Sequence, residues 1–164
     1  MNRVKKRRQT ERKTDYLARK KILAGGIGRV VIRKTNSYLI AEYVESKNAQ
    51  DKIIYGTSSK SLLNYGWPEN MKGSLKSLPA GYLTGYLVGK NIKGKQAIFD
   101  FGLIRNVPKS RLFAVVKGVI DAGVNAPVDK KSLPAEDRIK GKHMKKEIPF
   151  DKIKAAIEAG KGKK

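Results

Sequence analysis

Positive charge is gathered at the two ends of this chain, and that distribution limits where a hydrophobic core can form. Residues 1–34 hold thirteen lysines and arginines against two acidic residues, and residues 129–164 hold twelve against six. The 94 residues between them carry a net charge of only +6. Because like charges repel one another in a compact state, the core is predicted in the quieter middle. We expect a basic N-terminal arm and helix over residues 1–28, an α/β core domain over 29–126, and a basic C-terminal extension with a short helix over 127–164.

The total net charge of +23 indicates a polyanionic partner, since a polyanion relieves the repulsion and releases its own counterions on contact. Nucleic acid is the leading candidate. An anionic membrane is the rival, but the sequence has no basic amphipathic stretch with a broad apolar face and no apolar run near the roughly 18 residues that span a bilayer. The opening segment MNRVKKRRQT lacks the apolar stretch of a secretory signal, and the absence of cysteine excludes disulfides and thiolate metal sites. We expect a soluble intracellular protein with no membrane, small-molecule substrate, metal or cofactor.

Hydrophobic patterning predicts the element order α-βββ-α-β-α, which is typical of a two-layer α/β sandwich with a mixed sheet. Short polar links between the first three strands favour antiparallel pairing, and the later strand–helix–strand order favours a right-handed crossover with parallel pairing. Residues 45–51 are expected to form a polar connection. Residues 58–77 are expected to be mostly loop, with one helical turn near Ser61–Tyr65. The expected strands are 29–34, 38–44, 52–57 and 96–101, and the expected helices are 11–25, 78–93, 111–122 and 149–159.

Glycine spacing and capping residues give more detailed predictions for the helices. Gly81, Gly85 and Gly89 recur every four residues, so they share one helix face. Glycine costs about 1 kcal/mol in a helix interior, and close contact with another backbone is predicted to offset that cost. Ser77 and Ser110 are the expected N-cap residues of their helices. The last helix is too short to be stable alone and is expected to dock on the rest of the fold.

An enzymatic interpretation rests on few residues. Asp100, Asp121 and Glu42 are the candidate Mg²⁺ ligands of a basic nuclease or RNA-processing protein, which needs several carboxylates to converge. His143 is the only histidine and lies among lysines, where a phosphate contact or a solvated side chain is more typical than catalysis. We expect no catalytic residue. The nuclease is kept as the alternative from a different functional class, and a general nucleic-acid packaging protein is the third hypothesis.

Cations occur together with hydroxyls, amides or aromatic rings at three places, a pattern typical of RNA-binding surfaces. The arm combines the run 5–8 with the segment 12–19, in which Tyr16 either stacks on a base or packs into the core. Residues 33–36 are expected at a hairpin tip, with their cations pointing outward together. Residues 109–111 come just before and at the start of a helix, where free backbone N–H groups and two cations make a site for an anion.

Seven motifs follow one another over residues 7–143, and each alone is weak. They are Arg12-Lys13-Thr14-Asp15-Tyr16 with Arg19; Val30-Val31-Ile32-Arg33-Lys34-Thr35-Asn36; Tyr65-Gly66-Trp67; Pro79-Ala80-Gly81-Tyr82-Leu83-Thr84-Gly85; Asp100-Phe101-Gly102-Leu103; Phe113-Ala114 with Lys117-Gly118 and Asp121-Ala122-Gly123; and Arg138-Ile139-Lys140-Gly141-Lys142-His143. In this order and spacing, they resemble the large-subunit ribosomal protein L-eighteen family, which binds 5S rRNA, in its archaeal and eukaryotic form. The long C-terminal extension of eukaryotic members is missing, which favours the archaeal type.

The resemblance implies a structural constituent of the large ribosomal subunit in the cytoplasm. Such a protein binds 5S rRNA, tethers it to the large-subunit rRNA in the central protuberance, and lies beside neighbouring large-subunit ribosomal proteins. Tyr38 stands where the family often has a histidine, and a stacking role is expected to survive the change. With the residues identified above, the expected RNA contacts are Arg7, Arg8, Arg12, Lys13, Thr14, Tyr16, Arg19, Arg33, Lys34, Asn36, Tyr38, Lys109, Arg111 and His143.

Overall fold

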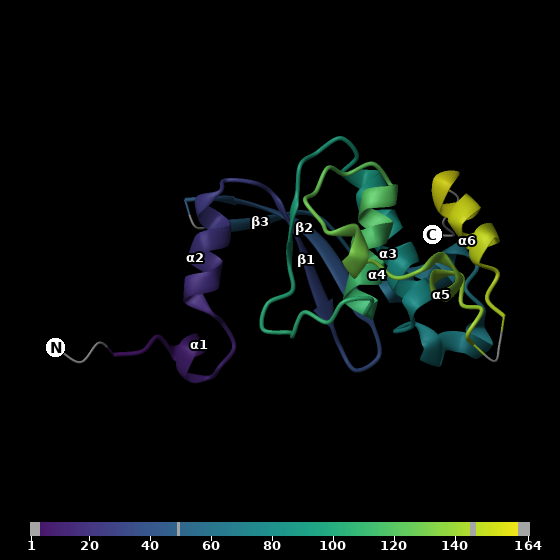
Figure 1. The fold of residues 1–164 in the computed structure, drawn as a ribbon, viewed down its shortest axis with the longest axis horizontal. Helices are drawn as coiled ribbons and strands as arrows, with labels where there is room; N and C mark the ends of the chain where they lie inside the picture. The colour runs from purple at the N-terminus through teal and green to yellow at the C-terminus, as the bar shows by residue number, and fades with distance from the viewer. Residues whose placement is uncertain (1–3, 49, 145–146, 161–164) are drawn as a thin grey trace.

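A four-stranded mixed sheet forms the centre of the protein in the computed structural model, which describes residues 4–48, 50–144 and 147–160 (Figure 1). The strand order is β3-β2-β1-β4; β2 is antiparallel to both of its neighbours, and β4 is parallel to β1. The α/β class, the mixed sheet and both kinds of pairing are therefore confirmed. The strands are β1 (Arg29–Lys34), β2 (Leu39–Lys47), β3 (Gln50–Ser58) and β4 (Ile98–Asp100).

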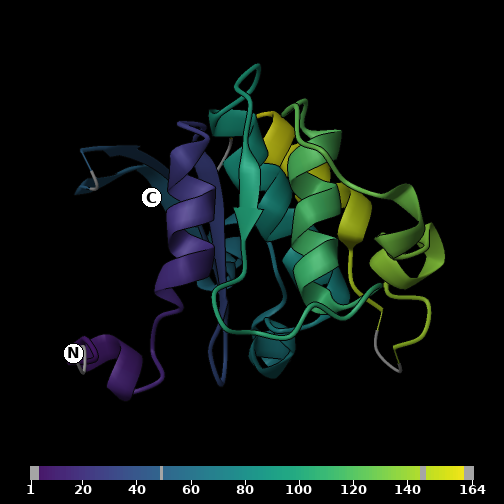
Figure 2. The same cartoon turned by 60° about the vertical axis from the view of Figure 1, so that its left-hand side comes forward.

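Helices lie on both sides of this sheet. In both views, α3 and α4 cover one face, α2 stands on the opposite side, and the C-terminal α6 lies beyond α3 (Figures 1 and 2). The α-helices are α1 (Arg7–Thr10), α2 (Tyr16–Ala24), α3 (Leu78–Asn91), α4 (Arg111–Asp121), α5 (Glu136–Ile139) and α6 (Phe150–Glu158). Three 3₁₀ helices are η1 (Ser59–Tyr65), η2 (Glu69–Ser74) and η3 (Lys130–Ser132). Among the described residues, no helix combines the length and the apolar character that crossing a bilayer requires.

The glycine face of α3 packs directly on the backbone of α4, as the glycine spacing predicts. A Cβ atom added to Gly85 would overlap the carbonyl oxygen of Val115, and one added to Gly118 would overlap that of Tyr82. Ser77 caps α3 by accepting a hydrogen bond from the N–H of Ala80 at 3.4 Å. The two helices thus approach backbone to backbone, and their packing offsets the intrinsic cost of helical glycine.

Two hydrophobic clusters make up the core, one under the sheet and one beneath the C-terminal helix. Val30, Ile32 and Leu39 face the first and are fully buried against α4. In the second, Ile153 and Ile157 of α6 are each only 1% exposed. The docking predicted for this helix is confirmed. The ammonium of Lys90 fixes its end by donating to the carbonyl oxygens of Ile157 and Glu158, both at 2.7 Å.

Several predicted boundaries were wrong. The helix expected over 11–25 begins at Tyr16, because Arg12 takes a left-handed conformation (φ 51°) and the Asp15 carboxylate caps the first turn. Residues 45–51 are not a connection: β2 runs on to Lys47 and β3 starts at Gln50, so the two strands form one long hairpin. Within residues 58–77, η1 confirms the expected helical turn near Ser61–Tyr65, and η2 is a second 3₁₀ helix where loop was expected.

The fourth strand is shorter than expected, and the predicted N-cap of α4 is in place but lacks its side-chain hydrogen bond. The fourth strand is only Ile98–Asp100, preceded by an isolated parallel bridge between Gln96 and Asn125. Ser110 occupies the N-cap position, but its hydroxyl makes no cap hydrogen bond and instead is buried without a partner among the described residues. The tips of the arm and of the C-terminal extension (residues 1–3 and 161–164) lie outside the described residues, as do 49, 145 and 146.

Candidate nucleic-acid interface

The basic arm is shaped by a short set of local hydrogen bonds. Asp15 Oδ1 accepts from the N–H groups of Leu17 and Ala18 at 2.9 and 3.1 Å, which fixes the start of α2. The guanidinium of Arg8 donates to Thr14 Oγ1 at 2.9 Å and so ties α1 to the turn before α2. These bonds keep two of the predicted RNA contacts together on one side of the turn.

Two further arm cations, Arg7 and Lys13, are exposed and make only weak surface pairs. Arg7 lies 3.8 Å and Lys13 2.9 Å from the carboxylate of Glu11. Tyr16 is half-buried, with the Lys6 ammonium 4.6 Å from the centre of its ring. It does not belong to either core cluster of the described residues. Since exposed ion pairs are worth little in water, these cations can exchange one acidic side chain for a phosphate at small cost.

An ion-pair cluster with one buried member, Arg29, joins α2 to the sheet. Asp51 Oδ2 lies 2.6 Å from a terminal nitrogen of Arg19 and 2.6 Å from one of Arg29, and Ser46 donates to Oδ1 at 2.6 Å. Arg29 is only 3% exposed, and nothing in the sequence pattern pointed to this contact. Burial raises the pKa of Asp51, but the hydrogen bonds from Ser46 and Arg19 and the charge of Arg29 outweigh burial and hold it below its ordinary value.

The expectation that Arg33 and Lys34 point outward together was wrong. Arg33 donates to the carbonyl oxygen of Asp100 at 3.0 Å, and a second guanidinium nitrogen lies 3.5 Å from its carboxylate. Lys34 pairs across the ladder with the buried Leu39, so it belongs to the α3/α4 face of the sheet. Successive side chains of a strand alternate between faces, and this alternation separates the two cations.

The face of the sheet to which Arg33 points, opposite α3 and α4, holds a cavity of about 300 Å³ between the arm and the end of β1, hereafter the arm cavity. Arg33 lines it over Gly102, whose φ of +64° and missing side chain leave room for the guanidinium. The structure thereby brings together five of the predicted contacts. They are Arg8, Lys13, Thr14, Arg19 and Arg33.

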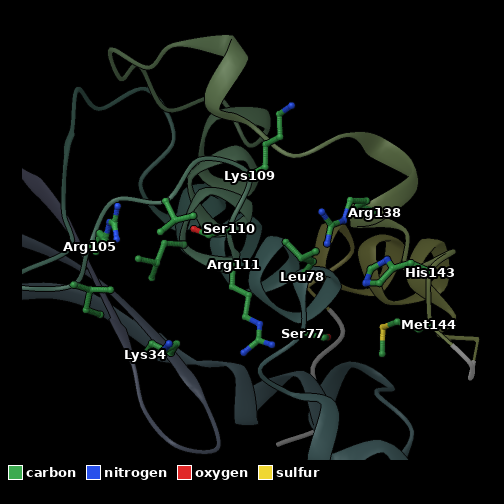
Figure 3. A pocket seen from close by; sticks show the side chains of 13 residues that line it. Lys34, Ser77, Leu78, Arg105, Lys109, Ser110, Arg111, Arg138, His143 and Met144 are labelled. Atoms are coloured by element: carbon green, nitrogen blue, oxygen red, sulfur yellow. The ribbon is translucent and has the colours of Figure 1, made fainter.

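The face of the sheet covered by α3 and α4, to which Lys34 points, holds a cavity of about 590 Å³ at the start of α4, hereafter the α4 pocket (Figure 3). It is larger than the arm cavity. Of the predicted contacts it gathers Lys34, Lys109, Arg111 and His143. Arg105 and Arg138 also line it, and the sequence analysis assigned neither of them a role. Arg138 lies in one of the motifs quoted above, which was the available signal. Apolar side chains complete the wall, and they are Leu78, Ile104, Val107, Leu112 and Met144.

Asn36 and Tyr38 lie apart from both cavities. The backbone oxygen of Asn36 accepts from the Lys76 ammonium at 2.6 Å. Tyr38 is half-buried and packs against the core cluster that contains Trp67. The Tyr38 ring is therefore only partly exposed, which leaves less of its surface for the stacking on a base that the sequence analysis expected.

The carboxylates that were considered as Mg²⁺ ligands of a nuclease make hydrogen bonds at different places in the fold. Asp100 Oδ1 accepts from the Gly102 N–H at 2.7 Å, whereas Asp121 Oδ2 accepts from the Tyr82 hydroxyl at 2.9 Å. In the described ranges, no three His, Cys, Asp or Glu side chains lie close enough together to hold a metal ion. Mg²⁺-dependent cleavage needs such convergence, so the geometry gives no support to this alternative.

Comparison with known proteins assigns this chain to a family. Residues 2–97 match the sequence profile described as "Ribosomal large subunit proteins 60S L5, and 50S L18". A large ribosomal subunit protein uL18 from Korarchaeum cryptofilum is 44% identical over 144 residues, which cover 86% of this chain and 72% of that protein.

Two further archaeal relatives carry the same name. The uL18 protein of Methanoculleus marisnigri is 40% identical over 146 residues, covering 87% of this chain and 81% of the relative. That of Sulfurisphaera tokodaii is 42% identical over 146 residues, covering 87% and 72%. The similarity thus extends well past residue 97 and includes segments that line both cavities.

Proposed function

This chain belongs to the family of ribosomal large subunit proteins 60S L5 and 50S L18, and from that premise we propose that it binds 5S rRNA and tethers it to the large-subunit rRNA in the central protuberance. The family membership itself makes the protein a structural constituent of the large ribosomal subunit, not an enzyme. Ribosomal RNA and neighbouring ribosomal proteins are its partners. The identity of the RNA and the position in the subunit are the parts that we propose.

The observation that supports this proposal best is the arm cavity. Arg8, Lys13 and Arg19 come from the arm, and Arg33 comes from the sheet, yet all four surround one hollow. Contacts to phosphates position a protein on RNA without reading its sequence, and they need cations arranged on a rigid frame. The Asp51 cluster supplies that frame, because it fastens α2 to β1 and β3 through Arg19 and Arg29.

The proposed tethering of two RNA segments is supported by Arg33 and Lys34, which are neighbours on β1 but point to opposite faces of the sheet. Arg33 faces the arm cavity and Lys34 faces the α4 pocket, so cations are offered on both sides of the sheet. A protein that joins two RNA segments needs two such surfaces. We propose that the arm cavity and the exposed arm contact 5S rRNA, and that the α4 pocket contacts RNA on the other side.

The test is a competition between RNAs for the full chain. The dissociation constant for 5S rRNA is measured at fixed salt beside that for an unrelated RNA duplex of the same length. We expect a preference of at least a hundredfold for 5S rRNA, and protection of a defined set of its nucleotides in footprinting. Equal affinity for the two RNAs would instead identify a general packaging protein and overturn the proposal.

A further inference from the structure

We propose that the α4 pocket receives a single unpaired nucleotide of an RNA strand, with its phosphate at the start of α4 and its base against the apolar wall. This inference deepens the proposed function and rests on it for the class of partner. It adds what the family name does not state: one of the two RNA-facing surfaces is built for an extruded nucleotide rather than for a duplex backbone.

The start of α4 supplies the phosphate end of the site. The first N–H groups of any helix lack intrahelical partners, and here the first regular bond is Ala114 N–H to the Ser110 carbonyl at 3.0 Å. α4 is eleven residues long, and its dipole adds partial positive charge at this end. Lys109 and Arg111 flank the same point, and Figure 3 shows their side chains leaving it in different directions.

The Ser110 hydroxyl independently indicates that a polar ligand group binds at the start of α4. Its oxygen is buried in the pocket wall and has no hydrogen-bond partner among the described residues, although it occupies an N-cap position where serine normally bonds the helix. Leaving a buried polar group unpaired is unfavourable, so such groups in native proteins require an explanation. Ser110 itself lines the pocket, so a rotation of its side chain would bring this hydroxyl to the pocket surface, where a phosphate or ribose oxygen would satisfy it.

The apolar wall distinguishes a nucleotide from a bare phosphate. Val107 is 49% exposed, and with Ile104 and Met144 it lines a space ringed by cations. A duplex backbone offers only sugars and phosphates to such a wall. An unpaired base offers an apolar face, and proteins read single-stranded RNA mainly by packing against unstacked bases.

Cations lie on opposite sides of the α4 pocket, as expected if an RNA strand enters the pocket on one side and leaves it on the other. Figure 3 shows Lys34 and Arg105 on one side of the start of α4, and Arg138 and His143 on the other. The first two come from β1 and the loop after β4, and the other two come from the C-terminal extension. Phosphates before and after the bound nucleotide would therefore each meet a basic side chain.

The experiment uses the full chain and 5′-phosphorylated pentauridylate, with inorganic phosphate and a five-base-pair duplex as comparisons. His143 is the only histidine, so its imidazole proton resonances report on this pocket alone. We expect a saturable shift of these resonances with pentauridylate, and at least tenfold weaker effects with phosphate or duplex. Equal effects of phosphate or of the duplex would overturn the proposal.

Two variants and a control test the two ends of the site. Ser110→Ala is expected to weaken pentauridylate binding about tenfold without lowering the thermal midpoint of the free protein, since the hydroxyl bonds nothing there. Val107→Ser is expected to weaken binding several-fold, whereas the matched variant Ile53→Ser, at a residue 57% exposed on β3, leaves it unchanged. Unchanged binding in both pocket variants, or an equal loss in Ile53→Ser, would overturn the proposal.

Binding of 5S rRNA is measured beside these titrations. If the chain failed to bind 5S rRNA while pentauridylate still shifted His143 and Ser110→Ala still weakened it, the pocket would stand and the 5S assignment would fall. If 5S rRNA bound normally and pentauridylate left His143 unmoved, the pocket proposal alone would fall.

Discussion

The guanidinium of Arg29 is almost completely buried and lies 2.6 Å from the carboxylate of Asp51. Two of its nitrogens, Nε and Nη1, have no partner in the described part of the chain, so Asp51 carries the whole task of balancing this charge. The same carboxylate holds Arg19 of α2. One aspartate on the edge strand therefore links the core of the sheet to the helix of the arm.

Removing this carboxylate is expected to destabilise the fold. Asp51→Ala leaves the buried Arg29 without its counter-charge, and an uncompensated buried charge of this kind costs about 3 kcal/mol. Urea unfolding followed by circular dichroism measures the change. Glu69→Ala removes the partner of an exposed pair with Lys72 and serves as the control, with a change within about 0.5 kcal/mol. Equal effects of the two substitutions would contradict a structural role for the Arg29–Asp51 pair.

The lowered pKa of Asp51 predicts how stability depends on pH. In the unfolded chain the group has its ordinary pKa near 3.8, and in the folded protein the pKa lies below that value. The contribution to stability is therefore fully present well above pH 3.8 and is lost as the pH falls through the folded pKa. Unfolding free energies measured between pH 6 and pH 2 are expected to fall less steeply in Asp51→Asn. Parallel curves for the two proteins would contradict this prediction.

The contact between α3 and α4 leaves no room for a side chain at its centre. Gly85→Ala would place a methyl group on the backbone of Val115, and overpacking of this kind costs about 1–3 kcal/mol or more, even though alanine favours a helix. Gly73→Ala is the control, because an added Cβ meets open space there. Thermal unfolding compares the two variants, and a stabilised Gly85→Ala protein would show that the helices do not pack as closely as described.

The proposed 5S rRNA interface predicts a steep dependence of affinity on salt. Each neutralised phosphate contributes about 0.7–0.9 to the log–log slope, so Arg8→Ala/Lys13→Ala is expected to lower that slope by about 1.5. Dissociation constants at several KCl concentrations provide the measurement. Lys60→Ala/Lys72→Ala removes the same charge away from the arm cavity, and its slope is expected to stay close to that of the unchanged protein. A flat salt response of the unchanged protein would contradict binding led by the arm.

Features that depend on neighbouring residues were predictable. The strand over residues 29–34 was correct at both ends, and the glycine spacing of Gly81, Gly85 and Gly89 predicted the backbone contact. The docking of the last helix followed from its apolar stripe and short length. These features depend on side-chain periodicity and backbone propensity, both of which are local properties of the chain.

The errors arose where a few side chains override local preference. The helix of the arm starts five residues later than expected because of the Asp15 cap and the left-handed turn at Arg12. Ser110 looked like an ordinary cap, but its hydroxyl is buried and makes no hydrogen bond to the helix. The Asp15 cap is itself local, since its carboxylate bonds Leu17 and Ala18, whereas the burial of the Ser110 hydroxyl depends on packing that its immediate neighbours do not specify.

The amino-acid order alone was enough to establish a basic, RNA-binding character, the class of the fold and the family, because charge, periodicity and motif spacing are written along the chain. The two cavities, in contrast, are created by the tertiary fold. Lys34, Arg105 and His143 meet in one pocket although about a hundred residues separate the first from the last, and Arg33 is directed away from its neighbour Lys34 by the alternation of a single strand. Such groupings depend on which distant surfaces pack together, and that balance of packing energies is not a property of any short segment.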